Sequence, residues 1–284
     1  VEEIRAGGQM VRETGLRVRS FYMGGGTPTT LSAQQMDRVL TAFEESFDRD
    51  RCQEITVEAG RPDTITAEKL AVLKAHGVNP QTMEDHVLRA IGRRHTSADI
   101  EAAMELVAGY GFPHVNMDLI AGLPADTPEG FRRSLDRCLA FETDNVTVHT
   151  LALKKGSRIL LEGLPIPGPE AVAEMLDYAA PALRKAGYSP YYLYRQKYIS
   201  GSFENTGWCR PGAECWYNVQ IMSELCSILS FGAGGSTKMV EPGTNHIERV
   251  FNLKYPKEYT ERPEKAAANQ AAFSAFYKSL KGAQ

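Results

Sequence analysis

A glycine-rich turn is the segment of this chain whose residue types are best suited to binding a ligand. Residues 21–23 are apolar and aromatic, and they run directly into three glycines at residues 24–26, followed by Thr27 and Pro28. Glycines at a strand end let a ligand approach the backbone, whose N–H and C=O groups can bind an ammonium or a carboxylate. The segment has neither the Lys-Ser/Thr pair of a P-loop nor the spacing of the dinucleotide fingerprint. It therefore predicts a site for a small, amino-acid-like ligand, with a simple tight turn as the alternative.

Four further residues stand at or near the ends of successive predicted strands, namely Glu58, Gln81, Asp118 and Ala152. In a barrel of parallel strands these ends converge on one face, where polar residues commonly carry function. An acid within the apolar segment 115–120 needs a partner if it is buried. The pattern predicts a functional cluster around Asp118, and the alternative is a structural carboxylate that caps a neighbouring loop.

Several basic residues could pair with carboxylates of a substrate. Arg93 lies in the segment 91–96, with a solvated helix-end charge as its alternative, and Arg195, Lys197, Arg210 and Lys238 lie near an aromatic stretch at residues 188–194. For each of them, solvation at the surface is the alternative. The histidines and cysteines match no common zinc spacing, so no metal ligands are predicted in this chain.

Strands and helices alternate along the part of the chain that carries these residues. The spacing predicts strands at residues 16–23, 54–59, 114–121 and 145–151, and helices at residues 33–47, 67–76 and 170–185. Such alternation at steps of about 30 residues predicts βαβ units and a parallel sheet, and hence an α/β protein.

One interval in this alternation is irregular. Glu58 and Asp118 are separated by 118 − 58 = 60 residues, which is two steps, yet residues 76–81 read as a helix end followed at once by a loop. We therefore expect one strand to be missing between Val78 and Asn79. A Gly/Pro-rich linker then begins at residue 163, and we expect one domain over residues 1–162 and another over residues 163–284.

Composition narrows the class of protein. The 284 residues are 43% hydrophobic and 24% charged, with a formal net charge of −3 and a pI near 6.1, which argues against a general nucleic-acid binder. No stretch approaches the roughly 20 apolar residues of a membrane span. Five cysteines without a repeating spacing or a secretory signal favour reduced thiols in a cytoplasmic protein. Because the chain begins with Val1 in a helical pattern, we expect it to be an internal portion of a longer protein.

Several ordered motifs give the chain a family resemblance. Residues 22–29, 57–63, 79–83, 91–96 and 116–124 together resemble the radical S-adenosylmethionine (SAM) enzymes of the oxygen-independent coproporphyrinogen III oxidase group. Residues 148–152, 191–197 and 214–218 are similar to the coproporphyrinogen dehydrogenase branch of that group. The resemblance implies a partial (β/α)6 TIM-like radical SAM barrel, here with one strand apparently missing, and a C-terminal α+β extension.

The resemblance also implies an activity and its cofactors. A [4Fe-4S] cluster and SAM would yield a 5′-deoxyadenosyl radical, which takes hydrogen from propionate side chains of coproporphyrinogen III. Loss of CO₂ then gives the vinyl groups of protoporphyrinogen IX in haem biosynthesis. By position, Gly25, Glu58 and Lys238 match contacts to a first SAM. Contacts to a second SAM are matched by Gly26, Thr27, Gln81, Arg93, Asp118 and Ala152. Arg195 and Lys197 are candidates for the substrate, and no catalytic residue is assigned.

The cluster-binding cysteines of the family have no counterpart in this sequence. The Cys-x-x-x-Cys-x-x-Cys motif would precede Val1, so we expect its ligands upstream and this chain to be inactive by itself. The expected partners are a tetrapyrrole substrate and an electron donor such as flavodoxin or ferredoxin, without nucleic acid. Two alternatives stay open: a related radical SAM enzyme that methylates or opens a tetrapyrrole ring, and a non-catalytic haem-binding trafficking protein.

Overall fold

The computed structural model describes residues 1–77, 79–83, 96–153, 157–196 and 200–282, and it divides into two compact units. The sheet unit comprises Tyr22–Ala33 and Ile55–Cys215, and the terminal unit comprises Val1–Phe21, Gln34–Glu54 and Trp216–Gln284. Within these described ranges, no helix is long and apolar enough to cross a membrane. The division predicted at residue 163 stays a prediction.

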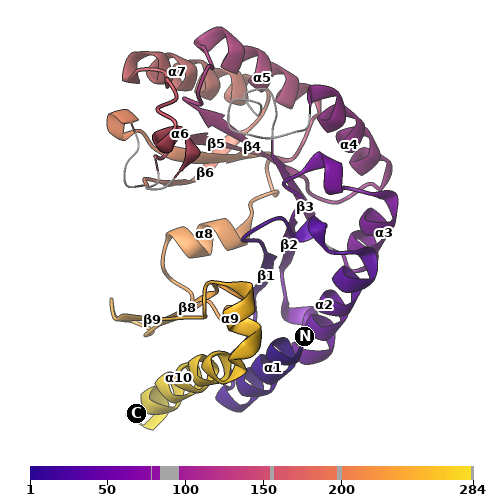
Figure 1. Cartoon of the computed structure of the whole chain (residues 1–284), viewed down its shortest axis with the longest axis vertical. Coiled ribbons are helices and arrows are strands. Elements are labelled where there is room, and N and C mark those ends of the chain that lie inside the picture. Colours follow the sequence, from indigo (N-terminus) through magenta and orange to yellow (C-terminus); the bar gives the residue numbers. More distant parts are fainter. Residues whose placement is uncertain (78, 84–95, 154–156, 197–199, 283–284) are drawn as a thin grey trace. The chain divides into compact units, whose positions relative to one another are not determined.

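The main sheet positions the candidate residues. In the described part of the chain it has seven strands in the order β1-β2-β3-β4-β5-β7-β6 (Figure 1). Pairing is parallel from β2 to β5, and β7 runs antiparallel to both β5 and β6. The strands are β1 (Ser20–Met23), β2 (Glu54–Glu58), β3 (Asn79–Met83), β4 (Asn116–Ala121), β5 (Asn145–Thr150), β6 (Ser189–Tyr194) and β7 (Asn205–Cys209).

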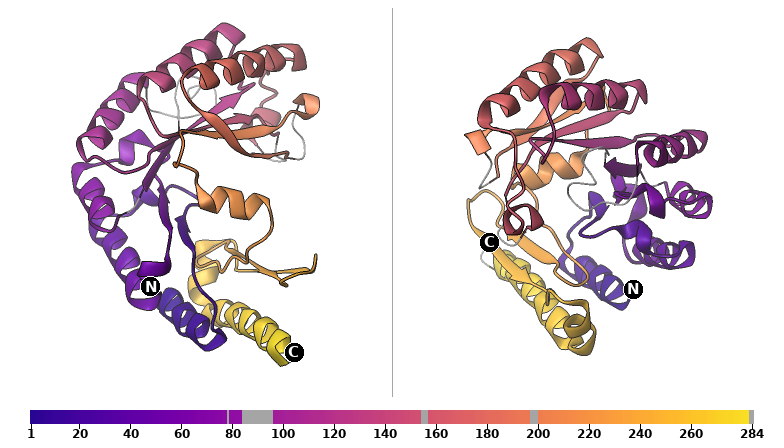
Figure 2. Two further views of the ribbon diagram at one scale, coloured as in Figure 1. Left: turned by 180° about the vertical axis from the view of Figure 1, so that it is seen from behind. Right: turned by 45° about the horizontal axis from the view of Figure 1, so that its top comes forward.

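Helices connect the parallel strands, as the alternation in the sequence predicts. The longer helices of the sheet unit lie on one side of its strands (Figures 1 and 2). One of them begins with the Thr96–Asp99 capping box, in which each side chain accepts a hydrogen bond from a backbone N–H of the first turn. Another begins at Thr127, whose side chain accepts a hydrogen bond from a first-turn N–H, and at Pro128, which has no N–H group that needs a partner. The helices are α3 (Ala67–Ala75), α4 (Ser97–Gly109), α5 (Pro128–Ala140), the short α6 (Arg158–Leu161) and α7 (Pro169–Lys185).

The core of the sheet unit lies between the sheet and its helices. Successive side chains of a strand point to opposite faces. On β4 and β5 one face is therefore largely apolar, and it packs with α5 and α7 through the buried Met117, Leu119, Val146, Val148, Phe131, Leu135, Met175 and Leu183. Each such side chain contributes about 1.5–3 kcal/mol through burial. The opposite face, which we call the inner face, carries polar residues of the same strands.

The expectation of a missing strand is wrong. Asn79–Met83 forms β3, which pairs in parallel with β2 and β4 and places Gln81 opposite Glu58 and Asn116. The segment is polar and contains Pro80, so its composition does not indicate a strand. Because β3 lies between β2 and β4, its backbone has hydrogen-bonding partners on both sides. This pairing outweighs the low strand propensity of its residues.

The terminal unit joins the two ends of the chain. Glu3 of α1 accepts hydrogen bonds from the backbone N of Gly232 at 2.7 Å and from Asn252 Nδ2 at 2.9 Å, and its carbonyl accepts one from Gln270 Nε2 at 2.8 Å. Tyr259 also donates to Glu3, and burial raises the pKa of that phenol. The elements are α1 (Glu2–Thr14), α2 (Ala33–Ser46), α8 (Trp216–Met222), β8 (Ser236–Val240), β9 (Ile247–Phe251), α9 (Pro256–Glu261) and α10 (Pro263–Gly282). The elements from α8 onward supply the expected C-terminal α+β extension.

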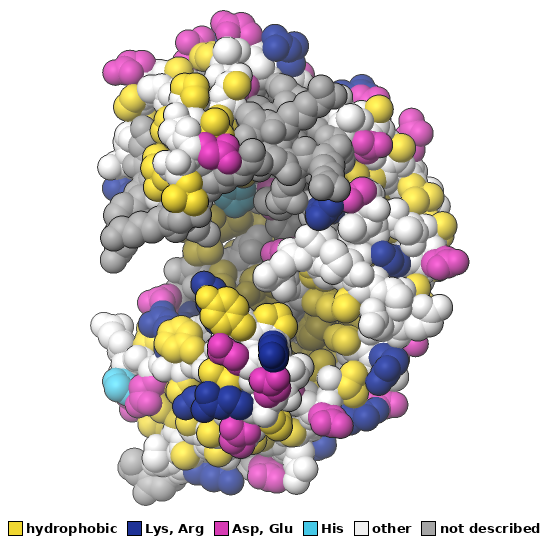
Figure 3. All heavy atoms as spheres, viewed as in Figure 1, with side chains coloured by type: hydrophobic (Ala, Val, Ile, Leu, Met, Phe, Trp, Pro, Cys, Tyr) yellow, Lys and Arg dark blue, Asp and Glu magenta, His cyan; other side chains and the backbone are white. Residues whose placement is uncertain are grey.

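Charged side chains of both signs are interspersed on the face that Figure 3 shows, and neither sign forms a continuous patch there. This distribution agrees with the net charge of −3.

Candidate functional site

The glycine turn follows β1 and needs its glycines for two different reasons. A Cβ on Gly24 would lie 2.6 Å from the ring of Tyr22 and 2.7 Å from Glu58 Oε1, so close approach excludes a side chain. Gly25 has φ +91°, which L residues rarely adopt. A Cβ on Gly25 or Gly26 would meet nothing within 4 Å among the described residues. The turn thus exposes its backbone at these two positions to open space.

Glu58 ends β2 beside this turn. Its Oε1 accepts a 2.5 Å hydrogen bond from Tyr22 Oη of β1, and the pair is partly buried. A short hydrogen bond to a charged acceptor is among the stronger kinds, so the phenol fixes the orientation of the carboxylate. The structure therefore brings the carboxylate of Glu58 next to a turn whose backbone is accessible at Gly25 and Gly26.

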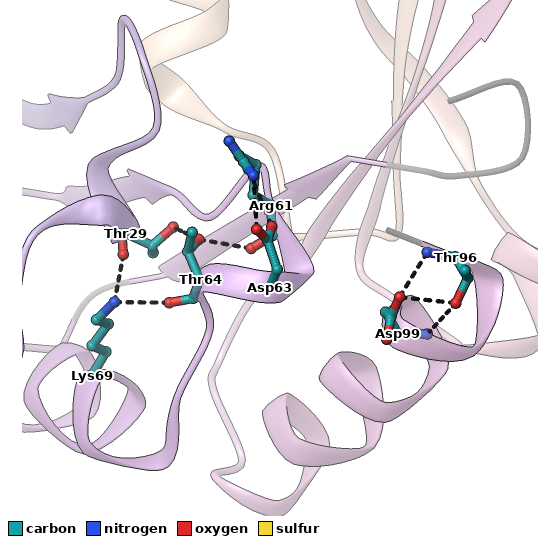
Figure 4. Close-up of polar contacts among 7 residues, drawn as sticks. All are labelled: Thr29, Arg61, Asp63, Thr64, Lys69, Thr96 and Asp99. Carbon is teal, nitrogen blue, oxygen red and sulfur yellow. Dashed lines mark hydrogen bonds and ion pairs between the residues drawn. The ribbon is translucent and has the colours of Figure 1, made fainter. Parts of the chain in front are cut away.

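Lys69 of α3 forms a network with Thr29 and Thr64, which lie on the turns after β1 and β2, and we call this network the lysine clamp (Figure 4). Lys69 Nζ donates to the carbonyl oxygens of Thr29 at 2.6 Å and Thr64 at 3.0 Å. The two threonine hydroxyls are 2.6 Å apart. Because Thr64 Oγ1 gives its one proton to the carbonyl of Arg61 at 2.7 Å, Thr29 is the donor between them. The clamp holds the segment after Thr27 against the segment after Glu58.

Asp118 lies on the inner face at β4 and is 6% exposed. Its Oδ1 accepts a hydrogen bond from Asn116 Nδ2 at 3.0 Å and is 3.6 Å from His149 Nε2. The other ring nitrogen of His149 is 3.1 Å from Tyr194 Oη. Burial, together with the negative charge of Asp118, raises the pKa of Tyr194 to about 12. Asp118 therefore has the partners that the sequence argument required of a buried acid.

The remaining candidates occupy more varied surroundings. Ala152 follows β5 and is half-buried, next to the hydrogen bond from Leu151 N to Ala121 O at 2.9 Å. Arg195 is exposed and pairs with Glu204 Oε1 at 3.1 Å, so its carboxylate partner belongs to the chain itself. Lys238 lies on β8 of the terminal unit, where it is 4% exposed and burial lowers the pKa of its ammonium. Arg93 and Lys197 lie outside the described residues, as does the side chain of Gln81.

Sequence reasoning left Tyr22 and Lys69 out of the site and gave Tyr194 no role. The sequence contained an indication for Tyr194, because residues two apart in a strand lie on one face and Tyr192 and Tyr194 therefore share a face of β6. For Lys69 none existed, since its partners are backbone carbonyls whose positions depend on the fold. Within the residues that the structure describes, no group of three His, Cys, Asp or Glu side chains could hold a metal ion.

Comparison with known proteins places these features in context. Residues 1–138 match the Radical SAM superfamily. Over 270 residues the chain is 41% identical to the oxygen-independent coproporphyrinogen-III oxidase-like protein HemZ of Bacillus subtilis, covering 92% of this chain and 54% of that protein. It is 34% identical over 232 residues to the heme chaperone HemW of Lactococcus lactis, covering 78% and 57%.

A solved structure shares the fold. The coproporphyrinogen III oxidase HemN from Escherichia coli matches 93% of this chain and 62% of its own with a TM-score of 0.68 at 21% identity. The chain spans a little over half the length of the two curated relatives named above.

Proposed function

This chain is a radical SAM protein homologous to the oxygen-independent coproporphyrinogen oxidase-like proteins, and we propose that the protein to which it belongs catalyses an oxidative decarboxylation in the cytoplasm. The reaction converts propionates of coproporphyrinogen III to vinyl groups and gives protoporphyrinogen IX. The observation that carries the proposal is the 41% identity to HemZ over 92% of this chain.

The residues of the sheet unit suit the cofactor that the family uses. The open backbone at Gly25 and Gly26, with Glu58 beside it, fits the amino-acid end of SAM, because carbonyls and a carboxylate bind an ammonium. Gly25 and Glu58 would hold a first SAM, and Gly26, Thr27, Gln81, Arg93, Asp118 and Ala152 a second. When bound, SAM and a [4Fe-4S] cluster supply the 5′-deoxyadenosyl radical. In this proposal the cluster cysteines lie upstream of Val1.

The chain's own residues orient the ligands. The packed core behind β4 and β5 fixes the backbone that carries Asp118 and His149, so their side chains are held in place before a ligand arrives. Arg195 and Lys197 would bind propionate carboxylates, for which Arg195 must leave Glu204. Residues 163–284 would cover substrate and cofactor, and a flavodoxin or ferredoxin would donate the electron.

The test uses full-length protein with a reconstituted cluster, incubated without oxygen with coproporphyrinogen III, SAM and a reductant. Mass spectrometry should find a product that has lost CO₂ and hydrogen at the propionates, together with 5′-deoxyadenosine. Cleavage of SAM without any loss of CO₂ would reject the proposal. A product of higher mass would instead indicate methyl transfer to the tetrapyrrole ring.

A second candidate function is haem binding without catalysis. It is supported by the 34% identity to a protein named as a heme chaperone in Lactococcus lactis. This function predicts tight binding of haem and no turnover of SAM, so the same preparation distinguishes the two candidates.

A further inference from the structure

At its carboxyl end, β5 is held by a side chain in place of a backbone partner. β5 and β7 pair antiparallel as far as Val148 and Thr206. In the same register the next hydrogen-bonded pair would be Thr150 with Glu204, because such pairs recur at every second residue of an antiparallel ladder. β7 begins only at Asn205, so Glu204 lies outside the strand. The backbone N–H of Thr150 therefore needs another acceptor on this side of β5.

Asn205 supplies this acceptor from its side chain. Its Oδ1 accepts a hydrogen bond from Thr150 N at 2.6 Å, and the exposed fraction is 0% for Asn205 and 3% for Thr150. On the other side of β5, Leu151 N donates to the carbonyl of Ala121 at 2.9 Å. Two consecutive N–H groups are thus held from opposite sides, which fixes the backbone at the point where β5 ends.

The other end of the same carboxamide has no partner. Asn205 Nδ2 is fully enclosed and makes no hydrogen bond to the described residues. A buried N–H group without an acceptor is unfavourable, and an apolar side chain of similar size would remove that penalty. Net stability therefore gives little reason for a carboxamide here. Its oxygen has a use that an apolar side chain lacks, which is to hold Thr150 N in place.

Residues on either side of Thr150 belong to the candidate site. His149 Nε2 lies 3.6 Å from Asp118 Oδ1 on the inner face, and Ala152 follows two residues after Thr150. In the proposed function, Asp118 and Ala152 both contact the second SAM. Because Asp118 lies on β4 and Ala152 directly follows β5, a shift at the end of β5 would move one contact relative to the other.

We propose that Asn205 is a positioning residue for the second SAM and acts by holding the end of β5 through Thr150 N. Asn205 does not itself touch the ligand, since its side chain is fully enclosed. The inference rests on the proposed function, which assigns Asp118 and Ala152 to that SAM, and it adds a residue outside the assigned set.

The test measures SAM binding to full-length, cluster-reconstituted protein by calorimetry, without a reductant so that SAM is not cleaved. Asn205→Leu keeps the approximate size of the side chain and removes the acceptor. One of the two SAM sites should bind about tenfold more weakly, as expected when one hydrogen bond no longer orders the site. Amide hydrogen exchange at residues 149–152 should be faster before SAM is added, because Thr150 N then lacks its acceptor. Asn205→Asp keeps an acceptor oxygen and should recover most of the affinity.

Asn145→Leu is the matched control, because Asn145 lies at the amino end of the same strand and is 3% exposed. Its Nδ2 donates to the carbonyl of Ala213, and its Oδ1 has no partner among the described residues. Each asparagine thus makes one backbone contact through one end of its carboxamide. The two leucine variants should have similar Tm values, and Asn145→Leu should keep the SAM affinity of the wild type.

Four results would overturn the inference. They are wild-type protein that binds fewer than two SAM molecules, equal SAM affinities for Asn205→Leu and the wild type, equal losses in the two leucine variants, and an Asn205→Asp variant as weak as Asn205→Leu. Should Asn205→Leu fail to fold, Asn205→Ala and Asn145→Ala are compared in the same way. Decarboxylation of coproporphyrinogen III is measured separately. Its absence in wild-type protein that binds two SAM molecules rejects the proposed function alone.

Discussion

Replacing Lys69 by methionine should loosen the glycine turn and weaken the binding of SAM. Lys69 Nζ donates to the carbonyls of Thr29 and Thr64, which follow the glycine turn and β2. Hydrogen bonds from charged donors contribute about 1.5–3 kcal/mol each when well buried. Because Lys69 is only half-buried, we expect the pair together to contribute about 1.5–3 kcal/mol. Methionine keeps the length of the side chain and removes the donor.

This loss should divide between stability and binding. In a protein of this size, about 1 kcal/mol corresponds to roughly 2–4 °C in Tm, so Lys69→Met should melt several degrees lower. In the variant, part of the binding free energy of SAM must be used to order the turn. If this part is about 1.4 kcal/mol, the Kd for SAM rises about tenfold. SAM affinity is measured by calorimetry on the full-length protein, beside thermal denaturation.

Lys74→Met is the matched control, because Lys74 lies on the same helix and donates to the carbonyl of Gly111 at 2.5 Å, away from the turn. It should lower Tm slightly and leave SAM affinity unchanged, and Lys69→Arg should recover part of the binding. Equal SAM affinities for Lys69→Met and the wild type would refute the positioning role. Equal losses in the two methionine variants would do so as well, because the effect would then follow general stability.

Four further predictions concern three glycines and Tyr194. Gly26→Ala should change Tm by no more than about 1 °C, since its Cβ would meet nothing within 4 Å and Gly26 lacks a positive φ, yet the variant should bind SAM more weakly. Gly25→Ala should also bind SAM more weakly, and its φ of +91° should in addition lower the free energy of unfolding by about 1 kcal/mol or more. Gly207→Ala should destabilise by about 1–3 kcal/mol or more in urea titrations, because its Cβ would lie 1.8 Å from the ring of Tyr192; a stability equal to that of the wild type would contradict the packing at β6 and β7. The phenol of Tyr194 favours its protonated form in the folded state, so its contribution to stability is complete below pH 10.0, the ordinary pKa of a tyrosine, and is lost as pH rises towards the folded pKa of about 12. Ultraviolet titration of the wild type against Tyr194→Phe measures this step, and ionisation near pH 10.0 in the folded protein would contradict it.

The sequence was sufficient where a strand carries its own pattern. Residues 116–121 and 145–150 are apolar and β-branched on the face that α5 and α7 cover, so local composition and tertiary packing agree. The same alternation placed Asp118 on the polar face. The turn at Gly24–Gly26 was predictable for another reason, because Gly25 adopts a φ of +91° that L residues rarely adopt and Gly24 has no room for a Cβ.

The sequence was insufficient where a segment is a strand only because of its neighbours. Asn79–Met83 contains a proline and polar residues, and its parallel partners on both sides determine its conformation. Asn205–Cys209 similarly has the composition of a loop, yet it forms a strand that pairs with β5 and β6. Gly207 lies opposite Thr147 and Tyr192 there, and its missing side chain leaves room for the ring of Tyr192. The lysine clamp depends on backbone carbonyls, which no sequence pattern marks.

The most direct test of the proposed function is the mass of the tetrapyrrole recovered after full-length, cluster-reconstituted protein acts on coproporphyrinogen III with SAM and a reductant. The proposal predicts loss of CO₂ and hydrogen from the propionates, with 5′-deoxyadenosine formed in step. Recovery of unchanged coproporphyrinogen while SAM is cleaved would contradict it.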